Sequence, residues 1–389
     1  MKALLHNAMD QPPPFDESGT RTFSWTAPGD PAIWFPMYTA LNKLTEANQP
    51  KFERLPVPIR YRATGAAQSW LKVTETAGDQ GKRLLTALRN PGAALCQVLD
   101  VLKTIITDNP LPTPDEGAAL GIASALLQGS LLMMHAQRQG GLFEPTPALH
   151  RMLAQTDVAD AMPVRFFQPP MPALFIVPEP TMWRQPDGFE ALLVLDHTGR
   201  ETGRTNEPVA RRFTFAAWAR NAQGHSVCDW LEFAIEDEDM PLADVLERAT
   251  SVARWQDAGP MKGMRDFDQC RWVSVLNYAV KMLLYLSVED AQVNHDQAYT
   301  KAPRQFPGLG KRKRELRLAE VEHLYDRYVV GPAVLAGQAA NGPHGATGVE
   351  VKTHWRRGHF RLQAHGPQAS LRKVMFIMPT MVRADLLGN

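Results

Sequence analysis

The sequence predicts an α+β protein: a helical N-terminal region, then an antiparallel meander sheet with packed helices, then a basic C-terminal β-hairpin. From about residue 67 to about residue 156, apolar residues recur at helical spacing. After Pro163 they form short β-branched and aromatic runs separated by turn signals. Near the C-terminus, two strand-like segments flank the turn His365-Gly366-Pro367. The order of the predicted regions follows from these changes in the spacing of apolar residues along the chain.

Five regions are expected along the chain. They are an extended arm over 1–31, a mainly helical domain over 32–160, an α+β domain with an antiparallel sheet over 161–295, a linker and basic helix over 296–348, and a basic hairpin over 349–389. The arm follows from Pro12-Pro13-Pro14, which no regular helix accommodates. The linker follows from the Pro and Gly residues before Lys311.

Helices are predicted where apolar residues repeat every three or four positions, as Leu95, Val98 and Leu102 do. The ranges are 67–76, 81–89, 92–107, 115–138, 146–156, 242–256, 268–289 and 311–328. Strands are predicted over 173–177, 189–195, 212–218 and 227–235. Only short turns separate these four strands, so an antiparallel meander is expected, because parallel neighbours need long crossovers.

The composition is that of a globular, water-soluble chain. Of its 389 residues, 44% are hydrophobic and 21% are charged. Cys96, Cys228 and Cys270 are widely spaced and form no CxxC pair, which indicates reduced thiols and a cytoplasmic protein. Neither a secretion signal nor a membrane span is expected, and no membrane is expected as a binding partner.

Positive charge is concentrated at the C-terminal end. Residues 301–389 contain fifteen Lys and Arg against six Asp and Glu, although the whole chain has a net charge of only +1. Such asymmetry favours a polyanionic partner for the basic part. The tetrad Lys311, Arg312, Lys313 and Arg314 is one candidate phosphate-binding patch, although a solvated basic helix start explains it equally well.

The second basic candidate is the terminal hairpin. Alternation along an unbroken strand places Trp355, Arg357, His359 and Arg361 on one face, with His354, Arg356 and Phe360 on the other, unless Gly358 forms a bulge. Arginines would contact phosphates, and Trp355 and Phe360 would offer stacking surfaces for bases. The candidate nucleic-acid-binding residues of both segments are Lys311, Arg312, Lys313, Arg314, Trp355, Arg356, Arg357, His359, Phe360, Arg361, Arg372 and Lys373. A solvated hairpin that only packs on the core is the alternative.

No catalytic motif is present: the chain has no P-loop, no GxGxxG after a strand, no HExxH and no GxSxG. One enzymatic alternative is a metal-independent ribonuclease with His354, His359 and His365 as general acid and base. The spacing of these histidines matches no common zinc pattern, so neither a metal nor a cofactor is expected. A purely structural protein is a further alternative, and no DNA contact is predicted.

Four segments resemble one known family: the strand Ala173-Leu174-Phe175-Ile176-Val177 after Pro172, the hydrophobic strand 188–195, the apolar helix 268–289, and the hairpin His354-Trp355-Arg356-Arg357-Gly358-His359-Phe360. They resemble the second family of type V-A anti-CRISPR proteins and its phage and plasmid relatives, over roughly residues 160–389. The resemblance implies a protein that recognises the N-terminal portion of a CRISPR effector nuclease as it is synthesised and lowers the effector's mRNA. It implies a nascent polypeptide, of the effector or another host protein, and RNA or the ribosome as partners.

Overall fold

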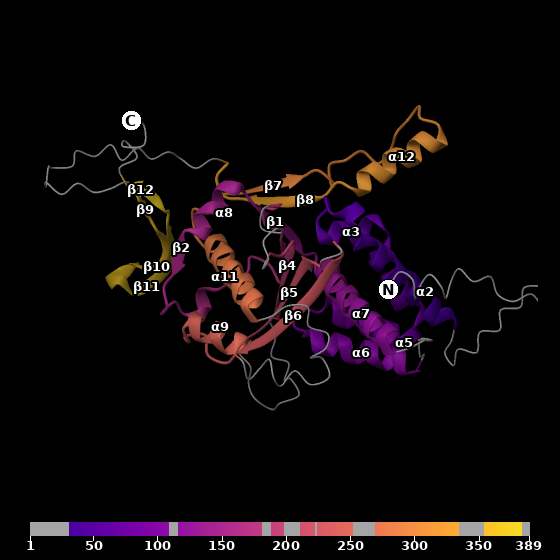
Figure 1. The fold of residues 1–389 in the computed structure, drawn as a ribbon, viewed down its shortest axis with the longest axis horizontal. Coiled ribbons are helices and arrows are strands. Elements are labelled where there is room, and N and C mark those ends of the chain that lie inside the picture. Colours follow the sequence, from indigo (N-terminus) through magenta and orange to yellow (C-terminus); the bar gives the residue numbers. More distant parts are fainter. Residues whose placement is uncertain are drawn as a thin grey trace, which may run out of the picture.

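The computed structural model describes residues 31–108, 116–180, 188–197, 211–221, 224–251, 269–333 and 354–382. A mixed β-sheet lies between two helical layers, and two smaller sheets contain the C-terminal strands (Figure 1). The α+β prediction is therefore confirmed. The predicted arm over 1–31 lies, except for Pro31, outside the described residues.

The first helical layer is formed by the N-terminal helices. They are α2 (Pro31–Ala47), α3 (Val57–Ala63), α4 (Ala66–Thr76), α5 (Gly78–Arg89), α6 (Leu95–Asp108) and α7 (Glu116–Gln137). The predicted helices over 67–76, 81–89, 92–107 and 115–138 are confirmed, whereas the sequence analysis missed α2 and α3. Helix α2 contains Pro36, which ordinarily interrupts a helix. Its buried residues Met37, Leu41 and Leu44 recur at helical spacing, and their burial explains why the helix persists.

The main sheet has seven strands in the order β6-β5-β4-β3-β1-β8-β7. The strands are β1 (Gly141–Pro145), β3 (Ala173–Ile176), β4 (Ala191–His197), β5 (Arg211–Arg220), β6 (Ser226–Ile235), β7 (Val293–Gln297) and β8 (Asp326–Val330). Strands β3 to β6 form the predicted antiparallel meander. Strand β1 adds two parallel pairings, with β3 and with β8, and β7 closes the sheet antiparallel to β8. These three strands were not predicted.

The region before the hairpin differs from its prediction. The basic helix α12 (Lys311–Glu322) ends before Tyr328, and residues 326–330 form β8 instead of helix. The expected linker over 296–312 begins with the last two residues of β7. The reason is long-range pairing: Asp326–Val330 bonds to β7 and β1, which lie distant in sequence. Of the flexible segment expected over 331–348, residues 334–348 lie outside the described part.

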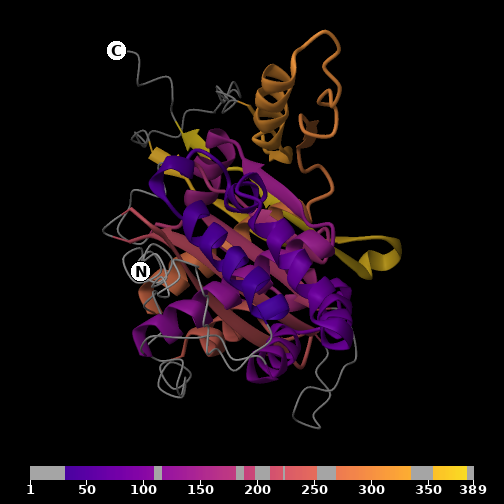
Figure 2. The same ribbon diagram turned by 90° about the vertical axis from the view of Figure 1, so that its right-hand side faces the viewer.

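Successive side chains of the central strands point to opposite faces of the sheet and pack into two different hydrophobic cores. Phe175, Leu193 and Trp218 face the N-terminal helices, together with Leu131 and Met134 of α7. Their sequence neighbours on the strands face the opposite layer, which contains Leu276 and Leu283. Figure 2 shows the N-terminal helices lying across one face of the sheet. The helical region thus shares a hydrophobic core with the meander.

The opposite layer is formed by α8 (Pro147–Ala154), α9 (Leu242–Thr250) and α11 (Gln269–Leu286), which correspond to the predicted helices over 146–156, 242–256 and 268–289. Next to it stand two small sheets. Their strands are β2 (Thr156–Val158), β9 (His354–Arg356), β10 (Gly358–His365), β11 (Leu371–Ile377) and β12 (Thr380–Val382). No helix in the described ranges is long and apolar enough to cross a membrane.

Candidate nucleic-acid interface

The predicted hairpin is present but interrupted. Strands β10 and β11 pair antiparallel, from His359 opposite Ile377 to His365 opposite Leu371. The chain breaks at Arg357, so β9 belongs to a separate sheet and pairs with β12. The unbroken strand assumed in the sequence analysis, with Trp355 to Arg361 on one face, is therefore wrong. The side chains of β9 and β10 therefore do not alternate across the two faces of a single strand.

Gly358 accounts for this break. A Cβ at this position would lie 2.7 Å from the Thr156 hydroxyl and 2.8 Å from the Ile377 carbonyl oxygen. The backbone of β10 approaches β2 on one side and β11 on the other, with Gly358 paired to Thr156 in the parallel ladder. Only glycine permits this approach. The Arg-Gly-His motif thus places β10 between β2 and β11, and the chain is interrupted here instead of continuing as one strand.

The inner face of the hairpin is part of the hydrophobic core. Phe360 is fully buried and stacks on Phe376 at 4.9 Å between ring centroids, and Val374 is buried beside them. Phe376 in turn meets Tyr285 of α11 edge to face. A buried ring offers no surface to a base, so the predicted stacking role of Phe360 is wrong. The side chains of Trp355 and His354 lie outside the described set.

The outer face carries the histidines and cations of β10 and β11. His359, Arg361 and His365 alternate along β10, and Lys373 lies opposite Gln363. Two cations of the hairpin already have anionic partners. Arg357 bonds to Asp157 of β2 at 3.2 Å, and Lys373 bonds to Glu289 after α11 at 2.8 Å.

These ion pairs change the electrostatics of the hairpin. Hydrogen bonding to Glu289 raises the pKa of Lys373, and the same contact lowers the pKa of Glu289. Arg372 donates to the carbonyl oxygens of Ala369 and Leu371 at the turn. Arg356, Arg361 and Arg372 are the exposed arginines of the hairpin for which no ion pair occurs among the described residues, and of these Arg372 is engaged by the two carbonyl oxygens. The hairpin therefore presents fewer free cations than its sequence suggests.

The basic tetrad is arranged differently. Lys311, Arg312, Lys313 and Arg314 form the first turn of α12, and all four are exposed. Arg314 donates to the carbonyl oxygen of Leu309. Within the described residues, Lys311, Arg312 and Lys313 have no hydrogen-bond or ion-pair partner of their own side chains.

The position of the tetrad is electrostatically unfavourable for the helix. The N-terminus of a helix is the positive end of its dipole, and no acidic residue lies in the first turn of α12. Four adjacent cations also repel one another. Helix stability therefore does not explain the tetrad, whereas an anionic partner would.

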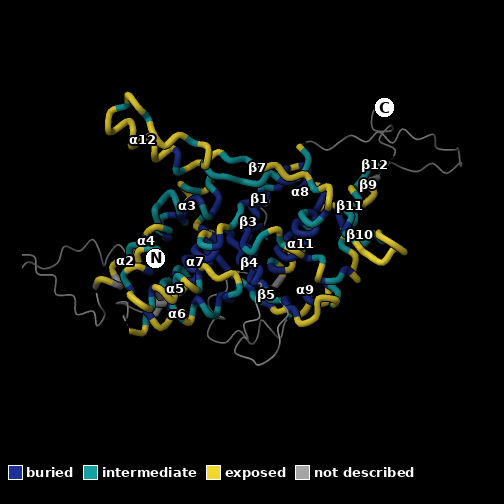
Figure 3. Tube along the Cα trace, turned by 180° about the vertical axis from the view of Figure 1, so that it is seen from behind, coloured by how far each residue is buried: buried dark blue, intermediate teal, exposed yellow. Residues whose placement is uncertain are grey.

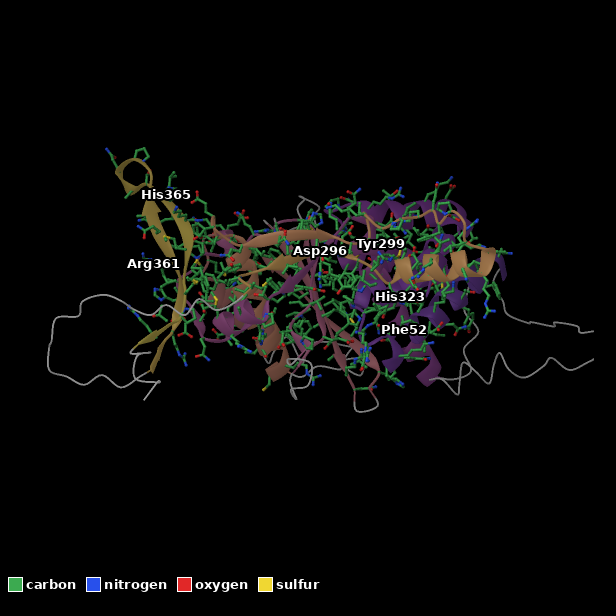
Figure 4. All side chains as sticks on the ribbon, turned by 90° about the horizontal axis from the view of Figure 1, so that it is seen from above. Phe52, Asp296, Tyr299, His323, Arg361 and His365 are labelled. Carbon is green, nitrogen blue, oxygen red and sulfur yellow. The ribbon has the colours of Figure 1, made fainter. Side chains whose placement is uncertain are left out.

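The two basic segments lie at opposite ends of the molecule. Helix α12 projects beyond the N-terminal helices, and the hairpin of β10 and β11 stands beside α11 at the far end (Figures 1 and 4). The candidate residues thus form two separate surfaces. Figure 4 places Arg361 and His365 at the hairpin end, with Tyr299 and His323 on the side of α12.

The segment from Tyr299 to Glu322, which includes α12, contacts the N-terminal helices through charged and aromatic side chains. The sequence analysis did not predict these contacts. The Tyr299 ring lies between the guanidinium groups of Arg62 and Arg304, at 3.7 and 4.1 Å from its centroid. Both arginines also pair with Glu322 of α12. Arg62 lies 260 residues before Glu322 in the sequence, so no local pattern could indicate this contact.

Of the three candidate catalytic histidines, His359 and His365 do not converge on one reaction centre, and the His354 side chain lies outside the described set. His359 and His365 are six positions apart on β10, which corresponds to about 20 Å along a strand. A general acid and a general base must both reach one phosphodiester, so this pair cannot serve it together. In the described part of the chain, no group of three His, Cys, Asp or Glu side chains could hold a metal ion.

The fold and surfaces define an α+β protein with two exposed basic elements. A family model, the anti-CRISPR type V subtype A2 family (AcrVA2-like), matches residues 143–384. The chain belongs to this anti-CRISPR family, as the resemblance implied. The match begins in β1 and includes every strand of the main sheet. Searches of curated proteins and of solved structures gave no match.

Proposed function

We propose that this protein is a cytoplasmic anti-CRISPR regulator that recognises the nascent polypeptide of a CRISPR effector and lowers the effector's mRNA, contacting RNA through its basic elements. Membership of the anti-CRISPR family supports the effector as target. The observation that carries the RNA contact is the first turn of α12, with three unpartnered cations at the positive end of a helix. Phosphates are the anions that would stabilise this arrangement.

The α12 tetrad is the main RNA contact in this proposal, and Arg356 and Arg361 are a second one. Arg357 and Lys373 contribute less, because binding a phosphate would require them to leave Asp157 and Glu289. The distance between the two surfaces means that each contacts RNA independently. A ribosome or a messenger RNA, both larger than the protein, would reach both ends.

The first test is a salt titration of RNA binding by the purified protein. Replacing Lys311, Arg312 and Lys313 with Ala should weaken binding and flatten its salt dependence by about two units of slope, at roughly 0.7 per phosphate on single strands. The matched control replaces Lys51, Lys82 and Arg165, which lie in exposed ion pairs with Glu46, Asp79 and Asp239. It removes the same charge and should leave the slope nearly unchanged.

The second test measures the effector mRNA in cells that express the effector together with this protein. The wild-type protein should lower the transcript only when the effector is translated, so a reporter with a mutated start codon should be insensitive. The Lys311, Arg312 and Lys313 variant should lose most of the effect. Equal transcript levels with and without the protein would rule out the proposed regulation. Cleavage of RNA by the pure protein that disappears in His359→Gln would instead favour a ribonuclease.

A further inference from the structure

The main sheet leaves one of its outer strands open. Strand β7 is the last in the strand order and pairs only with β8 among the described strands. It lies at the outer margin of the molecule, and its residues are exposed or intermediate in burial, whereas β4 is buried (Figures 1 and 3). No described element covers its outer side in these two opposite views. The backbone of β7 is therefore open to a further strand.

The hydrogen bonds between β7 and β8 show which backbone groups face outward. The Gly331 amide donates to the Gln292 carbonyl oxygen at 2.8 Å, so every second residue from Gln292 onward faces β8. The residues between them, Val293 and His295, therefore direct their N–H and C=O groups away from the sheet. These outward groups have no hydrogen-bond partner among the described residues.

The sequence of β7 does not protect this edge. Strand edges in proteins usually carry a feature that discourages a further strand, such as Lys, Pro, a bulge or a covering segment. Strand β7 has the sequence Val-Asn-His-Asp-Gln and pairs with β8 without a bulge. Other edges differ: at β6 the Ser226 amide donates to the Asn48 carbonyl oxygen, and β11 carries Arg372 and Lys373. Of these three edges, β7 is the best suited to accept another chain.

Three aromatic rings form a row across the strands next to this edge. Phe143 of β1 stacks on Tyr328 of β8 at 4.7 Å, and Tyr328 stacks on His295 at 4.3 Å between ring centroids. His295 is exposed and lies at the end of the row. A strand added at β7 would place one side chain directly opposite His295, on the same face of the sheet. An aromatic or branched apolar side chain at that position would continue the row.

The open edge specifies the chemistry of its partner. Outward N–H and C=O groups of a strand are matched by the backbone of an extended polypeptide, which presents the same groups at the same spacing. A second folded copy is a poorer match, because stable dimers bury at least about 1,200 Å². Strand β7 offers five residues and one large exposed apolar side chain, that of Val293. A nascent polypeptide is better suited, because it has not yet folded and its backbone groups are still unpaired.

Strand β7 also leads directly to the proposed RNA contact. Helix α12 lies in the connection between β7 and β8, so the open edge and the basic tetrad belong to one hairpin (Figure 1). A peptide that is still being synthesised lies close to ribosomal and messenger RNA. We propose that the outer edge of β7 binds an extended segment of the nascent polypeptide as an additional strand of the main sheet, with an aromatic or branched apolar residue opposite His295. The inference rests on the proposed recognition of a nascent polypeptide and specifies how the peptide is held.

The test uses the purified full-length protein and short overlapping peptides that cover the N-terminal segment of a type V-A CRISPR effector nuclease. Hydrogen exchange of the backbone amides is followed by NMR, and at least one peptide should slow the exchange of Val293 and His295. That peptide is then prepared with N-methyl groups on every second residue, in each of the two possible registers. Methylation of the residues that face β7 should weaken binding at least about tenfold, whereas methylation of the intervening residues should leave it nearly unchanged.

Variants of β7 separate the backbone contact from the side-chain contact. His295→Pro removes the outward N–H and no hydrogen bond to β8, and it should weaken peptide binding at least about tenfold. His295→Ala keeps the N–H but removes the ring, and it should weaken binding about two- to fivefold. The matched control is Asn294→Ala, because the Asn294 side chain lies on the opposite face of β7. This control should bind the peptide as the wild type does.

Three results would overturn the inference. They are that no peptide slows exchange in β7, that both methylated registers bind equally well, or that the Val293 and His295 amides are already protected in the free protein. In the last case, protection that grows with protein concentration would identify a second copy as the occupant. Protection at every concentration would identify another segment of this chain.

The peptide assay involves neither RNA nor translation, so its outcome is independent of the mRNA measurement. A peptide held at β7 without any effect on effector mRNA would refute the proposed function and leave the strand-addition site standing. Lowered effector mRNA without a peptide at β7 would refute the strand-addition site alone.

Discussion

At the scale of single residues, the most constrained group is the buried carboxylate of Glu190, which joins the helical layer to the sheet. It accepts hydrogen bonds from Arg60 of α3 at 2.7 Å and from Arg220 of β5 at 2.8 Å, and also from Ser226. Burial by itself raises the pKa of Glu190, but the two arginines and the hydrogen bonds lower it below its usual value. The carboxylate is therefore charged in the folded protein at neutral pH.

Glu190→Gln should cost about 3–5 kcal/mol of the free energy of unfolding at pH 7, because two guanidinium groups would remain buried without their anion. The folded pKa lies below the unfolded value of about 4.3, so the stabilisation is present above that pH and is lost as pH falls through the folded pKa. Urea unfolding of wild type and variant should therefore converge in acid. The control Glu46→Gln, in an exposed pair with Lys51, should cost less than about 1 kcal/mol.

At the scale of elements, the position of the C-terminal hairpin depends on Gly358. Gly358→Ala should destabilise the protein by about 1–3 kcal/mol, because the new methyl group meets Thr156, Ile377 and Pro379 at less than 3 Å. Thermal unfolding measures the loss, and hydrogen exchange should show it first in the amides of β10. The control is Gly310→Ala, where a Cβ meets nothing within 4 Å. Equal melting temperatures for both variants would contradict the close approach.

The elements also show what the sequence could predict. Helices α4 to α6 have apolar residues at helical spacing, and α7, β3 and β4 are continuous apolar runs between turn signals. These local patterns, together with those of β5 and β6, were sufficient to predict the elements. Strands β1, β7 and β8 have five residues each, and their partners lie far along the chain, so no local period marks them. The same limit applies to the candidate interface. The cations of Arg357 and Lys373 were visible in the sequence, but Asp157 and Glu289 were not recognisable as their partners.

At the scale of the whole molecule, the sheet depends on both of its helical layers. Phe175, Leu193 and Trp218 are fully buried under the N-terminal helices, although the family match begins only at residue 143. The sequence predicts separate domains over 32–160 and 161–295. The shared core instead leads us to expect that the sheet does not fold stably by itself.

A chain of residues 141–389 should therefore self-associate and bind a hydrophobic dye, because one face of the sheet would be exposed as a large apolar patch. Light scattering and dye fluorescence measure both effects, and co-expression of residues 31–140 should suppress them. The control is a chain of residues 31–389, which retains both helical layers and should stay monodisperse if the full-length protein does. A monomeric 141–389 fragment with cooperative unfolding would support the predicted boundary near residue 160, because the sheet would then need no cover from the N-terminal helices.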